Sequence, residues 1–419
     1  MTGARILCVS QDPQDLRRIL RTSRLEVVQW PESGVYGPDA PAQIEAACSG
    51  VRDVASLDCV VGENATSAPI LFELRRRGYR GPLALVPHVN PYPLSTFLMV
   101  FLAAQVWGPG DVVIVGSRAS ADLYGQFFGM NACAIPTYGI DTTLFERKDP
   151  AASRHRLGLP NGRLIVYTGR LARDKNVGGL LAAYQSLRKA VASVRLVLCV
   201  RFVDESYLEA LRPQLRDAIV LRDFDQTEMP YVYSAADLFA SCATSYYETF
   251  GRSPLESIAC GTPAVVPAWD GFREHVHAPA GLLVPVDFFE EPLAEEQSYG
   301  IVDLAAFVKA CASVLRDPPS AVPTLAPDIS STAAACRIRD AIDGLLGKSS
   351  GGTAQADLVA TTHELVLRVA KALRIESSDD LLRLATCHPS ELPRFENALQ
   401  RELYFALFAN GKRPCPSVS

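Results

Sequence analysis

Two glutamates, Glu248 and Glu256, stand eight residues apart around a glycine turn in the stretch Tyr-Glu-Thr-Phe-Gly-Arg-Ser-Pro-Leu-Glu. The pattern predicts a loop followed by a helix with Ser253 as its N-cap and Pro254 at its first position. The N–H groups at such a helix start have no intrahelical partners and suit an anion such as a nucleotide diphosphate. Carboxylates beside that anion can accept hydrogen bonds from neutral hydroxyls. The spacing therefore predicts a site for a molecule that carries both phosphate and hydroxyl groups.

A purely structural role accounts for part of this stretch. Residues 253–256, Ser-Pro-Leu-Glu, also fit a capping box, in which Glu256 reaches back to the N–H of the cap residue. A capping box does not account for Glu248, for the Phe250-Gly251 turn, or for a short helix that ends in Gly-Thr-Pro before an apolar strand. The combination favours a ligand site over capping alone.

A second element places two cations after a glycine, directly behind an apolar run. Arg170 and Lys175 follow Gly169 in the segment Thr-Gly-Arg-Leu-Ala-Arg-Asp-Lys. Fixed cations stabilise the negative charge that builds on a departing phosphate and do nothing comparable for neutral groups. Taken alone, such a segment is a solvated surface loop more often than a phosphate site.

His88 follows the apolar run 83–86, Leu-Ala-Leu-Val, and so stands at the carboxyl end of a predicted strand, where α/β sheets place ligands. An ordinary loop histidine held by a backbone carbonyl fits the same spacing. His275 and His277 have no third ligand type nearby, and we interpret them as structural. The acidic segment 223–225, Asp-Phe-Asp, is interpreted as a solvated turn, so no obligatory metal is expected.

These motifs resemble those of retaining glycosyltransferases with the GT-B fold, family 4 in particular, over about residues 80 to 290. The carriers are the glutamate pair and the Gly-Arg-Leu-x-x-x-Lys element of residues 169–175. The resemblance implies transfer of a sugar from a nucleoside diphosphate sugar, UDP- or GDP-linked, to a small-molecule acceptor in a cleft between two domains. It implies no cofactor, no obligatory metal and no enzyme nucleophile, because the leaving phosphate takes the acceptor proton.

The resemblance also assigns roles residue by residue. The catalytic residues would be His88, Arg170, Lys175 and Glu248, with Glu248 and His88 contacting the sugar. The donor-binding residues would be Gly169, Thr249, Phe250, Gly251 and Glu256, with Glu256 holding the ribose hydroxyls.

The chain departs from the family pattern at several positions. Residues 10–13, Ser-Gln-Asp-Pro, replace the glycine-pair loop after the first strand, and Tyr138 stands where many members have asparagine. Residues 244–245, Thr-Ser, replace a usual Pro-Ser, and residues 270–274 replace a paired-glycine loop. Acceptor recognition is therefore left open. Two other readings also stay open: a catalytically idle GT-B module that binds a sugar nucleotide or a partner, and an epimerase or phosphorylase on the same fold.

Short apolar runs alternate with helical segments, which is the pattern of parallel α/β sheets. The fold class is therefore α/β, and with the resemblance a GT-B architecture of two Rossmann-like domains plus a C-terminal helical extension. We expect an acceptor domain over 1–150, a linker within 145–162, a nucleotide-sugar domain over 160–346 and the helical extension over 353–419, part of which can cross back to the first domain. The strands are expected at 5–9, 26–29, 59–61, 83–86, 112–115 and 133–135, and then at 164–167, 195–199, 218–221, 238–240, 264–266 and 282–284.

Composition excludes several other classes. The chain has 419 residues, 48% of them hydrophobic and 21% charged, with a net charge of −5, which argues against an extended nucleic-acid surface. The apolar stretch 97–104 is much shorter than the roughly 20 residues of a membrane span and predicts a core helix. The N-terminus lacks a signal-peptide pattern and the eleven cysteines are scattered singly, so we expect a cytoplasmic protein without stable membrane insertion. Arginine far outnumbers lysine, which favours a GC-rich bacterial source and suggests natural-product biosynthesis; a homodimer is left open.

Overall fold

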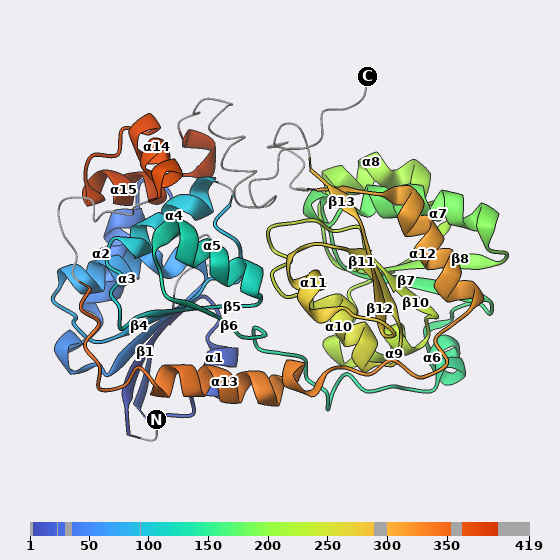
Figure 1. The fold of residues 1–419 in the computed structure, drawn as a ribbon, viewed down its shortest axis with the longest axis horizontal. Helices are drawn as coiled ribbons and strands as arrows, with labels where there is room; N and C mark the ends of the chain where they lie inside the picture. Colours follow the sequence, from blue (N-terminus) through green and yellow to red (C-terminus); the bar gives the residue numbers. More distant parts are fainter. Residues whose placement is uncertain are drawn as a thin grey trace. The chain divides into compact units, whose positions relative to one another are not determined.

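The computed structural model describes residues 3–22, 24–29, 36–92, 94–288, 300–352 and 363–392. The chain divides into two compact units, each with its own sheet and core (Figure 1). Unit 1 comprises residues 1–138 and 334–412, and unit 2 comprises residues 139–333 and 413–419. The chain thus passes from unit 1 to unit 2 after Tyr138 and returns to unit 1 within the helix that contains residue 334.

Unit 1 is built on a parallel six-stranded sheet with the strand order β2-β1-β3-β4-β5-β6. Its strands are β1 (Arg5–Ser10), β2 (Arg24–Gln29), β3 (Cys59–Glu63), β4 (Leu83–Val86), β5 (Val112–Val115) and β6 (Ala132–Ala134). Its helices are α1 (Gln14–Leu20), α2 (Ala40–Ser49), α3 (Ala68–Arg76), α4 (Leu94–Ala104), α5 (Arg118–Phe128), α13 (Ser331–Asp343), α14 (Glu364–Ala372) and α15 (Ser378–Ala385), with 3₁₀ turns η1 (Val54–Ser56), η2 (Ala65–Ser67) and η6 (Pro389–Glu391).

Helices cover both faces of this sheet (Figure 1). One face packs against α1 and α13, whose Ile19 and Ile338 share a buried cluster with Ile6 and Cys8 of β1. The other face is covered by α2, α3, α4 and α5, and α15 packs on α4 while α14 contacts α5. Burial on both faces explains why β4, Leu-Ala-Leu-Val, is a continuous apolar run rather than an alternating one.

Unit 2 repeats the architecture with the strand order β12-β11-β10-β7-β8-β9, all parallel. Its strands are β7 (Arg163–Leu171), β8 (Val194–Val203), β9 (Ala218–Arg222), β10 (Leu238–Ala240), β11 (Ala264–Pro267) and β12 (Gly281–Val284), and β13 (Val286–Asp287) pairs antiparallel with β14 (Ile301–Val302). Its helices are α6 (Pro150–Leu157), α7 (Val177–Ala190), α8 (Glu205–Leu215), α9 (Met229–Ser234), α10 (Arg252–Ala259), α11 (Asp270–His275) and α12 (Leu304–Arg316), with 3₁₀ turns η3 (Arg173–Lys175), η4 (Gln226–Glu228) and η5 (Pro327–Ile329).

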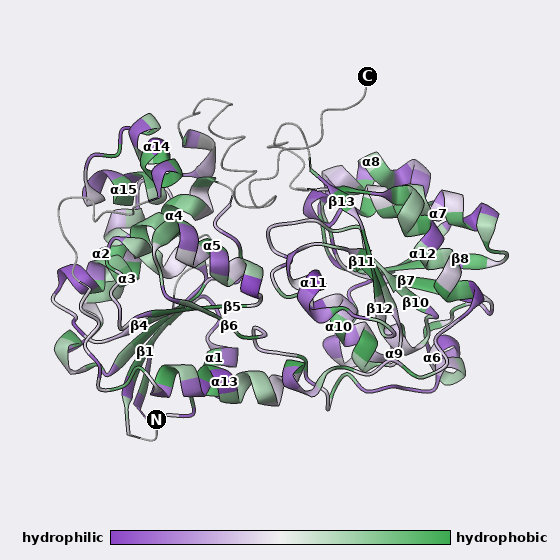
Figure 2. Cartoon of the chain, viewed as in Figure 1, coloured by the Kyte–Doolittle hydropathy of each residue, from purple (hydrophilic) through white to green (hydrophobic). Residues whose placement is uncertain are grey.

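Each predicted strand overlaps an observed one, and the ranges 83–86, 112–115 and 238–240 match to the residue. The apolar stretch 97–104 lies in α4 and is buried, as expected of a core helix. In both units the central strands are the hydrophobic elements (Figure 2). Apolar runs are reliable here because a strand covered on both faces has no position for a polar side chain.

The predicted linker is wrong as a description of residues 145–162. This stretch contains α6, which packs against α9. Arg154 of α6 donates to the carbonyl of Ala235 at 2.8 Å and to the carboxylate of Asp237 at 2.9 Å. Its charge and prolines suggested a loop, yet Asp149 caps the helix and Pro150 occupies its first position, where proline is tolerated.

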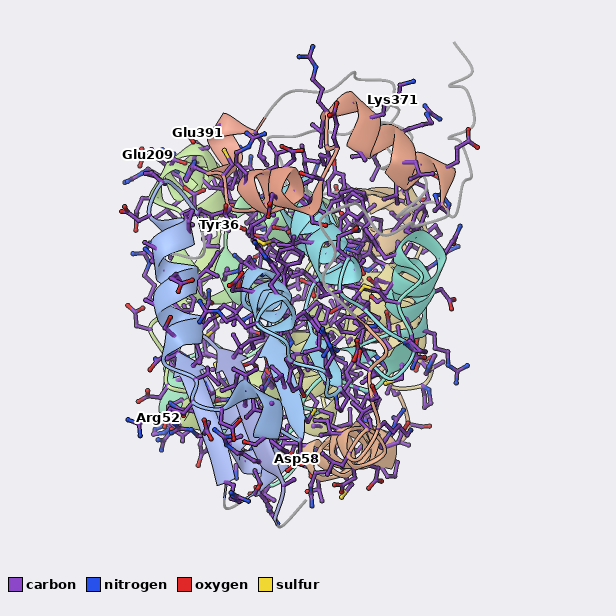
Figure 3. All side chains as sticks on the ribbon, turned by 90° about the vertical axis from the view of Figure 1, so that its left-hand side faces the viewer. Tyr36, Arg52, Asp58, Glu209, Lys371 and Glu391 are labelled. Carbon is purple, nitrogen blue, oxygen red and sulfur yellow. The ribbon has the colours of Figure 1, made fainter. Side chains whose placement is uncertain are left out.

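The predicted C-terminal helical extension is described in part. The helices α14 and α15 lie within it, and both belong to unit 1. Residues 353–362 and 393–419, with Leu358 and Cys415, lie outside the described residues. Within the described part of the chain, no helix combines the length and apolarity that a membrane crossing requires. Charged side chains such as Arg52, Lys371 and Glu391 project from the surface of unit 1 (Figure 3).

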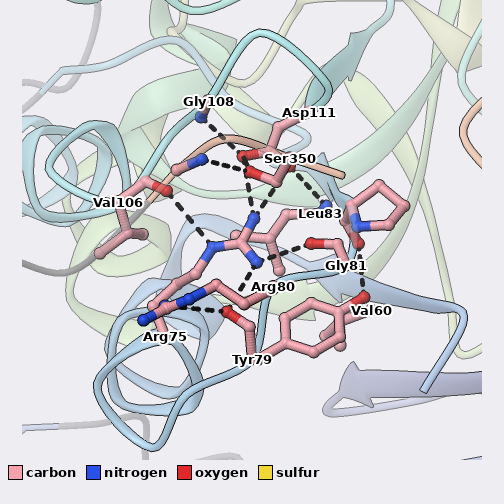
Figure 4. A network of polar contacts seen from close by, with 12 residues as sticks. Val60, Arg75, Tyr79, Arg80, Gly81, Leu83, Val106, Gly108, Asp111 and Ser350 are labelled. Carbon is pink, nitrogen blue, oxygen red and sulfur yellow. Dashed lines mark hydrogen bonds and ion pairs between the residues drawn. The ribbon is translucent and has the colours of Figure 1, made fainter. Parts of the chain in front are cut away.

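A fully buried ion pair holds the loop 347–352 to unit 1 (Figure 4). The guanidinium of Arg75 donates to both carboxylate oxygens of Asp111, at 3.0 and 3.1 Å, and neither side chain is exposed to solvent. Asp111 also accepts from the N–H of Leu83 at 2.8 Å, the N–H of Gly108 at 2.7 Å and the hydroxyl of Ser350 at 2.8 Å. The pair therefore joins α3, the start of β4, the loop before β5 and the returning C-terminal segment.

We predict that Asp111→Ala lowers the free energy of unfolding of unit 1 by about 3–5 kcal/mol, because it leaves the Arg75 guanidinium buried without a counter-charge. Hydrogen exchange of the β4 and β5 amides measures this loss for unit 1 specifically. The control Asp379→Ala removes an exposed partner of Arg76 on the same unit and should cost about 0–1 kcal/mol. Equal losses in the two variants would contradict a special role for the buried pair.

Candidate functional site

The strand order of unit 2 reverses between β7 and β10. From β7 the chain continues to β8 and β9 on one side, and then returns to place β10 on the other side. At such a reversal, the loops after the two neighbouring strands run in opposite directions from the carboxyl ends of the strands. Ligands of α/β proteins bind in the crevice between these loops. The first chemical motif, residues 169–175, covers the end of β7 and the turn that follows it. The second lies in the loop after β10 and in the start of α10, which carries Glu256.

Gly169 allows β7 to turn sharply at its end. Its φ is 153°, and the pairing with β8 shifts register between Gly169 and Leu171. A Cβ at this position would lie 2.8 Å from the hydroxyl of Tyr167, which itself donates to the carbonyl of Arg170 at 2.8 Å. The Arg170 guanidinium lies over the ring of Tyr247, 5.0 Å from its centroid. A glycine is therefore needed where the backbone aims Arg170 toward the second loop.

A buried carboxylate that the sequence analysis missed holds both cations. Asp174 has no exposed side-chain surface, and its Oδ2 lies 2.6 Å from the Arg170 guanidinium and 3.6 Å from the Lys175 ammonium. Its Oδ1 is buried without a hydrogen-bond partner in the described part of the chain. Burial raises the pKa of Asp174, against the opposing effect of Lys175 and Arg170. The feature of the sequence that could have indicated Asp174 is its position between two cations predicted to bind phosphate.

Lys175 joins the two motifs directly. Its ammonium forms an ion pair with Glu248, 73 residues further along the chain, and the two side chains are only 16% and 12% exposed. The next residue, Asn176, caps α7 by accepting from the N–H of Gly179 and donates to the carbonyl of Cys242 at 3.2 Å. The loop after β7 is thereby fastened to the loop after β10 at two points. The predicted residues Arg170, Lys175 and Glu248 belong to one cluster.

The predicted N-cap of α10 is wrong. The helix begins at Arg252 with Gly251 as its N-cap, at a φ of 86°, and no side chain caps it. Pro254 is thus the third helical residue, where its missing N–H costs nothing because the first four N–H groups have no intrahelical partner. The Ser253 hydroxyl instead hydrogen-bonds Tyr233. Glu256 is the fifth helical residue rather than a member of the first turn, so the capping box does not form.

Glu256 has a different set of partners. It accepts a hydrogen bond from the Tyr233 hydroxyl at 2.8 Å and lies 3.5 Å from the Arg252 guanidinium. Tyr233 also hydrogen-bonds the hydroxyl of Thr168, at the end of β7, at 2.7 Å. Burial raises the pKa of Tyr233 well above its usual value, so its hydroxyl stays protonated and donates to the carboxylate. Tyr233 therefore positions Glu256, a role that sequence spacing did not indicate.

The turn that carries Thr249, Phe250 and Gly251 packs closely against α11. A Cβ on Gly251 would lie 2.6 Å from the Phe272 ring, and one on Gly271 would lie 2.5 Å from the Thr249 carbonyl oxygen. The N–H of Gly271 donates to the carbonyl of Glu248 at 3.2 Å. All three turn residues are buried. Close contact with α11 thus fixes the backbone between the two glutamates.

His88 lies in unit 1, whereas the other predicted site residues lie in unit 2. It follows β4 with a φ of 61°, and its Nε2 lies 3.2 Å from a carboxylate oxygen of Glu63. The sequence analysis did not select Glu63. The feature of the sequence that could have indicated Glu63 is its position as an acid at the carboxyl end of a buried strand. His88 was selected because it stands at the same end of a neighbouring strand.

The histidines interpreted as structural make local contacts. The Nε2 of His277 lies 2.7 Å from the Glu274 carbonyl oxygen, and the His275 ring packs edge-on against Phe250 at 5.3 Å. Asp223 and Asp225 are exposed in the turn after β9, as predicted. Among the described residues, no three His, Cys, Asp or Glu side chains are grouped so as to hold a metal ion.

Comparison with known proteins finds a family model that matches part of unit 2. Residues 151–296 match the family model "Glycosyl transferases group 1". The chain is similar to the alpha-monoglucosyldiacylglycerol synthase of Streptococcus pneumoniae, with 31% identity over 37% of each chain. It is also similar to a GDP-mannose-dependent alpha-(1-6)-phosphatidylinositol dimannoside mannosyltransferase of Mycobacterium tuberculosis, with 28% identity over 43% of this chain and 47% of that one. The matches span less than half the length of these relatives.

Solved structures extend the likeness to both units. Sucrose-phosphate synthase from Thermosynechococcus elongatus aligns with a TM-score of 0.59 and 17% identity, over 82% of this chain and 95% of that chain. Anabaena Alr3699/HepE in complex with UDP and glucose aligns with a TM-score of 0.57 and 20% identity, over 81% and 98%. Two parallel six-stranded sheets with this likeness define a GT-B fold of two Rossmann-like units. The segment that matches the group 1 family model carries both chemical motifs of unit 2.

We predict that Gly251→Ala destabilises unit 2 by about 2–5 kcal/mol, the sum of a left-handed backbone cost of about 1–2 kcal/mol and overpacking against Phe272 of about 1–3 kcal/mol. Gly158→Ala is the matched control, because Gly158 has a φ of 64° but nothing within 4 Å of the added Cβ. Hydrogen exchange of the β7 and β10 amides gives both losses. The difference between the variants measures the Phe272 contact, and no difference would contradict the close packing.

Proposed function

We propose that this protein is a retaining glycosyltransferase that moves a sugar from a UDP- or GDP-linked donor to a small-molecule acceptor. The observation that carries the proposal is the ion pair between Lys175 and Glu248, which unites the motif after β7 with the motif after β10 at the switch point of unit 2. One side of this cluster is cationic and suits phosphate, while the other presents carboxylates and suits hydroxyls. A nucleoside diphosphate sugar carries both kinds of group.

The cluster also suits the chemistry of transfer. As the bond between the sugar and the diphosphate breaks, negative charge grows on the leaving phosphate oxygen. Arg170 and Lys175, fixed by Asp174, stabilise that charge without a rearrangement during the reaction. The acceptor oxygen attacks the anomeric carbon from the face that the leaving phosphate departs from, and its proton passes to that phosphate. No enzyme nucleophile takes part, and the configuration at the anomeric carbon is retained.

The remaining assignments are those that the resemblance to the family implies. Glu256, held by Tyr233, binds the ribose hydroxyls, and Glu248 binds hydroxyls of the transferred sugar. The N–H groups of Thr249, Phe250 and Gly251 contact sugar or phosphate. Unit 2 is the nucleotide-sugar domain and unit 1, with His88, is the acceptor domain. The named relatives include glucosyl and mannosyl transfer enzymes, so the donor base and the sugar are left to experiment.

The first test is calorimetric titration of the purified chain with UDP, GDP, ADP and dTDP. We expect micromolar binding of one nucleotide, and at least tenfold weaker binding by Glu256→Ala. Arg170→Ala should lower the transfer rate at least tenfold, about 1.4 kcal/mol, because it removes charge stabilisation from the transition state.

Glu209→Ala is the control for both site variants, since Glu209 lies exposed on α8 and pairs with Arg212 of the same helix. It should bind nucleotide and transfer sugar at the wild-type level. Folded wild-type protein that binds none of the nucleotides would overturn the proposal in favour of an idle module.

A further expected outcome concerns metal. Because Arg170 and Lys175 supply the positive charge that a divalent cation would bring to the diphosphate, we predict that transfer continues at an unchanged rate in excess EDTA. Activity that EDTA abolishes and Mg²⁺ or Mn²⁺ restores would contradict this. The comparison uses one enzyme preparation with and without chelator, so the folded fraction is identical in both arms.

A further inference from the structure

The sheet of unit 1 has a switch point of its own. Its order β2-β1-β3-β4-β5-β6 reverses between β1 and β3, because the chain passes from β1 to β2 on one side and then to β3 on the other. Ser10 is the last residue of β1 and Glu63 is the last residue of β3. Both side chains therefore lie where ligands of α/β sheets bind. A buried carboxylate at this position calls for a physical explanation.

Glu63 is 6% exposed, and three side chains bind its carboxylate. One oxygen, Oε1, contacts both the Tyr138 hydroxyl and the His88 Nε2, the latter at 3.2 Å. The other oxygen, Oε2, accepts from the Ser10 hydroxyl. These partners come from the ends of β1 and β4 and from the segment after β6. One carboxylate therefore binds side chains from three segments at this edge of the sheet.

The protonation states in this cluster determine the direction of each hydrogen bond. Burial alone would raise the pKa of Glu63, but the hydrogen bonds from His88, Ser10 and Tyr138 outweigh it and the pKa is lowered. Burial and the nearby Glu63 charge raise the pKa of Tyr138 well above its usual value. Glu63 is therefore an anion near neutral pH and Tyr138 is a neutral donor. An anionic carboxylate only accepts hydrogen bonds, so the His88 Nε2 must carry a proton.

Backbone strain supports a positioning role. His88 and Tyr138 have φ values of 61° and 60°, in the left-handed region that residues other than glycine seldom adopt. Their rings meet edge-on with centroids 5.1 Å apart. Strain of this kind persists only where surrounding contacts determine the conformation, and it gathers at functional sites.

We propose that Glu63 is a positioning residue that fixes the His88 ring in the Nε2–H tautomer. The effect of this tautomer on sugar transfer rests on the function proposed above; the tautomer itself does not. A neutral imidazole is a donor at one nitrogen and an acceptor at the other, and the partner of one nitrogen decides the state of the second. Ser10 and Tyr138 hold the carboxylate so that it does not turn away from His88.

The tautomer is tested directly by two-bond ¹H–¹⁵N correlation spectra of protein labelled with ¹⁵N-histidine, recorded at about pH 8, above the usual imidazole pKa. The chain has six histidines, and His88→Gln identifies the signal of His88 by its loss. We expect the Nε2–H pattern in the wild type and a shift toward a tautomer mixture in Glu63→Gln, because an amide can donate as well as accept. An Nδ1–H pattern in the wild type, or an unchanged pattern in Glu63→Gln, overturns the proposal.

Tyr138→Phe is the matched control. It removes one donor to the same carboxylate oxygen while leaving the contact between Glu63 and His88 in place. We expect the Nε2–H pattern to persist in this variant. A tautomer mixture in Tyr138→Phe equal to that in Glu63→Gln would mean that general loosening of the cluster, not the carboxylate charge, sets the ring, and would overturn the proposal.

Kinetics then test whether Glu63 acts through His88. We expect Glu63→Gln and His88→Gln each to lower kcat/KM about tenfold, and the double variant to be no slower than His88→Gln alone. Fully multiplied losses in the double variant overturn the positioning role. UDP or GDP binding by unit 2 should be unchanged in Glu63→Gln. Absence of nucleotide binding and transfer in the wild type would refute the proposed function, while the tautomer spectra still decide the role of Glu63.

Discussion

The reversal of strand order within each parallel sheet is the constraint on which the sites depend. A strand covered by helices on both faces must be apolar, so polar side chains are confined to its ends. At a reversal, the chain segments that follow two neighbouring strands run in opposite directions. No crossover connection therefore covers the carboxyl ends of these two strands. In unit 2 that position carries Gly169 and the loop of Glu248, and in unit 1 it carries Ser10 and Glu63.

Buried carboxylates then fix the groups at these ends. Burying a carboxylate is unfavourable unless hydrogen bonds or a counter-charge compensate, so each one restricts the geometry of its partners. Asp174 orients Arg170 and Lys175, and Glu63 orients His88. The same rule applies away from the sites, where Asp111 joins the returning C-terminal segment to unit 1. A preorganised charge needs less rearrangement when a ligand or transition state forms, which is what a catalytic site requires.

The sequence predicted the strands because their apolar runs are a local property. It selected Arg170, Lys175 and Glu248 because their spacing matches a known pattern; the structure brings these side chains into one cluster, and their roles in transfer stay a prediction. It failed where tertiary contacts decide. Gly251 caps α10 because packing against Phe272 fixes the turn, not because of a local cap signal. Tyr233 of α9 binds Glu256 in place of the expected cap residue, and Asp174 is fully buried although it lies between two cations in the sequence. None of these facts is encoded within a few residues of the motif.

The departures from the family pattern acquire a common explanation in unit 1. Ser10 stands where a glycine-pair loop was expected and Tyr138 where asparagine was expected, and both bind Glu63. A glycine loop presents backbone N–H groups that suit a phosphate. An ionised carboxylate at the same edge repels a phosphate and attracts hydroxyl donors. Ser10 and Tyr138 therefore change the electrostatics of this edge together. Under the function proposed above, they favour an uncharged, hydroxyl-bearing acceptor over an anionic one.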